Sequence, residues 1–140
     1  MRVLLVGVHA GAQGPIHRLA GWMRYGLERQ GCSVDLAPWG QRSSRESLLM
    51  KCLQRPRDAA AISRRILVGS YDVVLLNTSH DWRALVRDVP LVLSAKRKAV
   101  PLILLYHGTC GTKLMAADQG LYRRVFGWRS RACTGTFLLA

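Results

Sequence analysis

The sequence predicts an α/β protein with a doubly wound, Rossmann-like parallel sheet. Short apolar runs alternate with longer stretches of helical periodicity, which is typical of βαβ units. The first run, residues 3–8, is apolar throughout, as expected for a central strand covered on both faces. The chain has 140 residues, 49% of them apolar and 21% charged. This length and composition exclude a disordered chain and predict one domain over residues 1–140.

Five strands are expected, each a short apolar run bounded by glycine, proline or polar residues. They are residues 3–8, 33–37, 73–76, 102–106 and 135–139. Right-handed crossovers give a doubly wound sheet, for which we expect the order 3-2-1-4-5, with strands one and four as neighbours. The fifth strand ends the sequence without a closing helix, which would leave a sheet face open. We therefore expect a truncated piece or one partner of a split protein.

The first and last helices are predicted from their periodicity and their end signals. The first begins at Pro15, which suits an initial helical turn, and ends before Gly31 in the C′ position. The last is expected over residues 114–126.

Proline sets the expected boundaries of the middle helices. Ser43 or Ser44 is a candidate cap for the second helical region, which Pro56 divides before a further piece over residues 58–68. Asp81 is a candidate cap for a short helix after the third strand. A separate helix is then expected to begin around Pro90.

Several classes of site are absent from the sequence pattern. The four cysteines form no C-x-x-C pair, and no histidine or carboxylate spacing predicts a metal site. No G-x-S-x-G nucleophile motif occurs, and no cofactor is expected. No apolar stretch approaches the ~20 residues that span a bilayer, and no signal-peptide pattern opens the chain. These features favour a cytoplasmic protein.

Ligands of doubly wound sheets bind beyond the carboxyl ends of the strands, so the loops after strands one, three and four form the candidate site. In the expected order, the loops after strands one and four face each other across one crevice. The first of them contains His9, Gly11 and Gly14 ahead of a helix N-terminus, where backbone amides bind anions. A tight turn explains the glycines equally well.

His107 is the leading single candidate, because it directly follows a buried strand and precedes Gly108 and Thr109. A histidine there can bind a sugar hydroxyl, orient a phosphate or act as a base near neutral pH. A bond to a backbone carbonyl is the structural alternative. His9 and His80 also lie in loops at strand ends, and for each of them a structural role is the favoured interpretation.

Charge is the compositional outlier, with 21 Lys and Arg against 8 Asp and Glu and a net charge of +13. Such a surface attracts nucleic acid, anionic membranes or phosphorylated substrates. No nucleic-acid motif accompanies the charge, so no specific nucleic-acid partner is expected. The helix at 114–126 suits an anionic bilayer, although a core-facing helix with a basic edge is favoured.

Three segments resemble family 4 (group 1) glycosyltransferases. MRVLLVGVHAGAQGPIHRLAGWMRYGLERQGCSVDL resembles their opening strand, glycine loop and helix, with Cys32 where a histidine is usual. YDVVLLNTSHDWRALVRDVPLVLSAKRKAVPLILLYHGT is similar to their central block, with Thr78 and Ser79 where a histidine is often found. RSRACTGTFLLA resembles the strand that follows. The likeness runs through the amino-terminal half of the usual enzyme.

The resemblance implies the acceptor-side half of a GT-B fold, from a retaining enzyme that moves a sugar from a nucleotide-sugar donor to a glycan or lipid-linked acceptor. By position, Gly11 and Gly14 match the loop near the donor phosphates. His107 matches the histidine after strand four and is the expected catalytic residue. The missing donor-binding domain implies that the isolated chain is inactive. Some relatives dock on membranes, which implies peripheral attachment to the inner face of the membrane.

Two alternatives remain open at the level of sequence. One is a non-catalytic basic module that binds an anionic membrane, nucleic acid or a partner domain. The other is a small nicotinamide-dependent domain, in which Asp35 near the end of strand two would bind the ribose.

Overall fold

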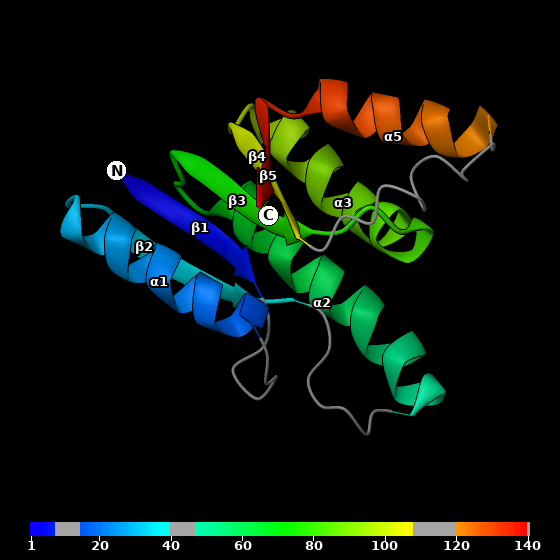
Figure 1. Cartoon of the computed structure of the whole chain (residues 1–140), viewed down its shortest axis with the longest axis horizontal. Helices are drawn as coiled ribbons and strands as arrows, with labels where there is room; N and C mark the ends of the chain where they lie inside the picture. The colour runs from blue at the N-terminus through cyan, green and yellow to red at the C-terminus, as the bar shows by residue number, and fades with distance from the viewer. Residues whose placement is uncertain (8–14, 40–46, 108–119, 140) are drawn as a thin grey trace.

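The computed structural model describes residues 1–7, 15–39, 47–107 and 120–139. Its five parallel strands form one sheet with helices on both faces, which confirms the doubly wound α/β class (Figure 1). The strands are β1 (Arg2–Gly7), β2 (Ser33–Pro38), β3 (Val73–Thr78), β4 (Leu102–His107) and β5 (Gly135–Leu139). The helices are α1 (Pro15–Arg29), α2 (Leu48–Val68), α3 (Trp82–Lys98) and α5 (Gly120–Ala132).

The strand order is β2-β1-β3-β4-β5, so the expected order 3-2-1-4-5 was wrong. β3 lies between β1 and β4 and pairs with both. Right-handed crossovers permit either order, and the inner strands have equally apolar sequences, so the pattern does not distinguish them. The observed order moves the topological switch point to the gap between β1 and β3, and the first and fourth strands are not neighbours.

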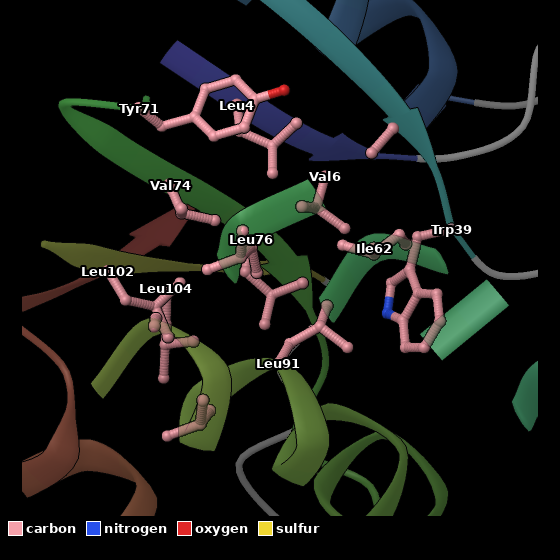
Figure 2. Close-up of a cluster of buried hydrophobic side chains, with 14 of the residues drawn as sticks. Leu4, Val6, Trp39, Ile62, Tyr71, Val74, Leu76, Leu91, Leu102 and Leu104 are labelled. Carbon is pink, nitrogen blue, oxygen red and sulfur yellow. The ribbon is translucent and has the colours of Figure 1, made fainter. Parts of the chain in front are cut away.

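The two faces of the sheet bury separate cores. Side chains alternate along a strand, so Val3 and Leu5 face α1 whereas Leu4 and Val6 face α2 and α3. The larger core lies under α2, α3 and α5, and its labelled members include Leu76 and Leu91 (Figure 2). The α1 face is covered by Met23, Leu27 and their neighbours.

The end of α1 confirms the role of Gly31. Its φ is +76°, a left-handed conformation that glycine adopts without strain. The Gly31 amide donates to Glu28 O at 3.0 Å, and the Cys32 amide donates to Leu27 O at 3.0 Å. This pair of bonds is a Schellman motif, which turns the chain from α1 toward β2.

Both interior prolines were misjudged, because α2 runs through Pro56 and α3 runs through Pro90 without a break. A proline inside a helix costs roughly 3 kcal/mol. Burial of Ile62 and Ile66 on α2, and of Leu91 on α3, offsets that cost. Tertiary packing therefore outweighs the local signal.

The caps were partly predicted. Asp81 caps α3 as expected, and its Oδ1 accepts a bond from Ala84 N at 2.9 Å. Ser47 caps α2 through a bond from Met50 N at 3.3 Å, in place of the expected Ser43 or Ser44.

The last helix continues beyond its expected end at residue 126. α5 spans Gly120–Ala132, and residues 114–119 lie outside the described ranges. No helix within those ranges is both long and apolar enough to cross a membrane.

Candidate functional site

The carboxyl ends of three central strands bring polar residues together at the switch point. Strand alternation and register place Gly7 of β1, Asn77 of β3 and His107 of β4 on the α1 face of the sheet. Asn77 and His107 are both buried, at 7% and 9% exposure. A buried amide and a buried imidazole at this edge mark the part of the sheet where such folds bind ligands.

The Asn77–His107 pair fixes the chemistry of the imidazole. Asn77 Nδ2 donates to Val6 O at 3.0 Å, so the Asn77 Oδ1 is the atom that faces His107 Nε2 at 2.6 Å. An amide oxygen only accepts, and therefore Nε2 carries the hydrogen and Nδ1 carries the lone pair. Burial lowers the pKa of His107, which keeps the ring neutral near pH 7.

Gly7 keeps β1 close to this pair. A Cβ at position 7 would lie 3.4 Å from Asn77 Nδ2 and 3.6 Å from the Ala20 Cβ of α1. A larger side chain would therefore enter the space beside the amide. Within the described ranges no donor bonds to His107 Nδ1, so this nitrogen can accept a bond from a hydroxyl or take up a proton.

A second polar cluster lies at the same edge of the sheet but on its opposite face. Arg129 of α5 donates to Asp88 Oδ2 at 3.2 Å, to Thr78 Oγ1 at 3.3 Å and to the Tyr106 hydroxyl at 2.7 Å. The Thr78 hydroxyl also donates to Asp88. Arg129 and Asp88 are both 0% exposed, so this ion pair is fully buried. The cluster joins β3, β4, α3 and α5.

Two further side chains complete the coordination of the Asp88 carboxylate. Trp39 Nε1 donates to it at 3.2 Å and Arg87 Nε donates at 2.9 Å. The predictions from sequence missed this cluster, because Asp88 lies at the start of the helix expected around Pro90 and Arg129 is one of 21 basic residues. One signal was present: Arg129 follows Tyr122 and Phe126 at helical spacing, on the stripe of α5 that faces the core.

His80 belongs to an aromatic cluster beside Arg129. Its ring stacks on Tyr106 with a centroid distance of 3.9 Å, and the Tyr122 hydroxyl donates to its carbonyl oxygen at 2.5 Å. Burial, and secondarily the nearby Arg129 charge, lowers the pKa of His80. His80 therefore lies on the face of the sheet opposite His107, and the structure does not bring these two histidines together.

The remaining candidates lie outside the described residues. They are His9, Gly11, Gly14, Gly108 and Thr109. The parts of the chain that are described contain no group of three histidine, cysteine or acidic side chains placed to hold a metal ion.

Comparison with known proteins gives a likeness of fold. No protein-family model and no curated protein sequence matches the chain. Among solved structures, a 2-deoxyribosyltransferase from the psychrotolerant bacterium Bacillus psychrosaccharolyticus matches with a TM-score of 0.51 and 11% sequence identity. The match covers 98% of this chain and 85% of that chain. That protein is described as a biocatalyst for the synthesis of nucleosides.

These findings overturn the glycosyltransferase interpretation. No family model matches the chain, and a solved structure that resembles it is a 2-deoxyribosyltransferase. The expected partners, a nucleotide-sugar donor with a glycan or lipid-linked acceptor at a membrane, were therefore wrong. The alternative of a basic module for membranes, nucleic acid or a partner domain gains no support either. The physical basis of the first interpretation also fails, since it required β1 and β4 to be neighbours and β3 lies between them.

Proposed function

We propose that this chain binds a nucleoside at the switch point between β1 and β3, on the α1 face of the sheet. The observation that carries the proposal is the imidazole of His107, which Asn77 orients at 2.6 Å and burial keeps neutral. Its Nδ1 lone pair suits a hydroxyl of ribose or deoxyribose, because a sugar hydroxyl is a neutral donor. The structural likeness to a 2-deoxyribosyltransferase supports a nucleoside over other sugar-bearing ligands.

The proposal concerns binding. Attack on the anomeric carbon of a sugar generally requires a carboxylate beside it. Within the described ranges, Asp81 is bonded to the first turn of α3, and Asp88 is enclosed on the other face of the sheet. Neither bonds to Asn77 or His107, so the pair supplies recognition of a hydroxyl.

Calorimetric titration with uncharged nucleosides tests the proposal. The net charge of +13 attracts any phosphate, so thymidine and 2′-deoxyadenosine are better probes than nucleotides. We expect saturable binding that changes little between 0.1 and 0.5 M salt. The corresponding 2′,3′-dideoxynucleosides lack the sugar hydroxyl at the 3′ position and should bind more weakly if that hydroxyl meets Nδ1.

Two matched variants assign the binding to the site. His107→Gln removes the Nδ1 acceptor and should weaken binding about five- to tenfold, the value of one neutral hydrogen bond. His80→Gln makes the same change on the opposite face and should leave the affinity unchanged. Equal effects of the two variants, or an absence of saturable nucleoside binding, would refute the proposal.

A further inference from the structure

A groove of about 910 Å³ lies between α2 and α3, on the face of the sheet opposite Asn77 and His107. The two helices pack side by side along this face (Figure 1). The volume lies within the range of pockets that enclose small organic molecules. Its described lining includes Arg55 and Pro56 of α2 and Trp82, Arg83, Val86 and Arg87 of α3.

The walls of the groove are mainly apolar. Pro56 comes from α2, and Trp82, Val86 and Pro90 come from α3. Val86 is 61% exposed, which leaves a large aliphatic side chain in contact with solvent. Trp82 makes an edge-to-face contact with Tyr122 of α5, with a centroid distance of 5.5 Å, and this contact helps to hold the indole in place. An apolar ligand body would therefore meet fixed apolar walls.

The charged side chains of the groove are mostly cationic. Three arginines line it, against Asp81 as the one carboxylate among the described lining residues. The Asp81 carboxylate is already bonded to Ala84 N and to the Ser79 hydroxyl. The first turn of α3 adds the partial positive charge of a helix N-terminus. The groove consequently favours an anion over a cation.

Arg87 is held in position at this groove. Its Nε donates to Asp88 at 2.9 Å, and its guanidinium lies 5.1 Å from the centre of the Trp39 ring. This bond uses Nε and leaves the two Nη groups for other acceptors. Asp88 also pairs with Arg129, so one carboxylate serves two guanidiniums and a positive charge remains.

We propose that this groove binds a small amphipathic organic anion, with an aromatic or aliphatic body and one carboxylate, sulfonate or phosphate group. The body would pack on Trp82, Val86 and Pro90, and the anionic group would bind Arg83 and Arg87. Charge argues against a second copy of the chain as the occupant, because each copy carries +13. The site is independent of the proposed nucleoside site, from which the sheet separates it.

Fluorescence titration of the whole chain tests this assignment with two related dyes. 1-Anilinonaphthalene-8-sulfonate has an aromatic body and a sulfonate, whereas N-phenyl-1-naphthylamine has a similar body and no charge. At 0.15 M salt we expect the sulfonate to bind about tenfold more tightly, with one dye per chain. Equal affinities for the two dyes would overturn the proposal, because they would show that the arginines do not contribute.

Matched variants on α3 locate the dye. Arg83→Gln should weaken binding of the sulfonate about five- to tenfold, and Arg97→Gln, the same change in the last turn of α3, should alter it less than twofold. Val86→Asp should weaken binding more than tenfold, compared with Leu93→Asp at an exposed position that does not line the groove. Urea unfolding of each variant confirms that it is folded.

Two further outcomes contradict the assignment. The first is an equal effect of the groove and control variants, which would mean that the dye binds elsewhere. The second is a dimer in analytical ultracentrifugation that Val86→Asp dissociates, since a second copy would then occupy the groove.

Discussion

Replacing Arg129 with methionine should strongly destabilise the protein, because it leaves the buried Asp88 carboxylate without its main cationic partner. Arg129 and Asp88 are each 0% exposed, and their nearest charged atoms are 3.2 Å apart. The variant also removes the bond to the Tyr106 hydroxyl at 2.7 Å. Methionine has a similar length, so most of the apolar packing of the side chain is retained.

The magnitude follows from burial. Removing one partner of a buried ion pair costs about 3–5 kcal/mol, because the other charge stays desolvated. Arg87 still donates to Asp88, and its side chain is 26% exposed, which places the expected loss near the lower end, about 3 kcal/mol. A domain of this size is stable by about 5–15 kcal/mol, so the variant should remain folded at low temperature.

Urea unfolding followed by tryptophan fluorescence measures this loss. With an m value near 2 kcal/mol/M, the midpoint should fall by about 1.5 M. Arg24→Ala is the control, because it breaks an exposed pair with Glu28 on α1 that is worth only about 0.3–0.5 kcal/mol. A double variant, Arg129→Met with Asp88→Asn, removes both charges and should lose about 1–3 kcal/mol less than the sum of the single variants.

The reasoning fails if Arg129→Met costs less than about 1 kcal/mol, or if the double variant loses the full sum of the two single losses. The first result would mean that the pair is solvated in solution. The second would mean that the two side chains contribute independently, and the ion pair would then not be the interaction that matters.

Three further predictions rest on single residues. Ala99 has a left-handed φ of 55° at the end of α3, so Ala99→Gly should raise the free energy of unfolding by roughly 0.5–1 kcal/mol in urea melts, and a loss would contradict the backbone argument. Burial lowers the pKa of His107, so between pH 7 and that lowered pKa the unfolded chain binds more protons than the native chain, and the free energy of unfolding should fall as the pH falls below about 6.5. His107→Gln should reduce this pH dependence in urea melts, and an unchanged pH dependence would refute the assignment to His107. Burial raises the pKa of the Cys133 thiol to about 11, so iodoacetamide at pH 8 should modify this thiol about a hundredfold more slowly in the native than in the urea-unfolded protein. Peptide mass spectrometry measures the two rates, and equal rates would contradict the burial of Cys133.

The fold class was predictable because the apolar composition of the inner strands indicates that they are buried. The core residues of β1 and β4 form unbroken apolar runs, which are typical of a strand covered on both faces. The strand order was not predictable on the same basis. Placing β3 beside β1 depends on where α2 and α3 pack, which involves contacts between residues far apart in the chain.

Half of the candidate site was predictable for a similar reason. His107 follows a buried strand, so its place at the carboxyl edge came from local sequence alone. Its partner Asn77 was not singled out, because pairing two strand ends requires the register between β3 and β4. The family resemblance had the same weakness: strand, glycine loop and helix recur in many Rossmann-like domains, and the fold does not determine function.

The two polar clusters at the carboxyl edge are physically connected through the strands that carry them. Asn77 and Thr78 are consecutive residues of β3, and Tyr106 and His107 are consecutive residues of β4. In each strand one residue therefore faces α1 and the next faces α3 and α5. Arg129 bonds to both Thr78 and Tyr106 and so joins the two strand ends on the face of the sheet opposite α1. Arg129 therefore adds a side-chain link to the β3–β4 ladder at the strand ends that carry Asn77 and His107, on the face of the sheet opposite the proposed nucleoside site.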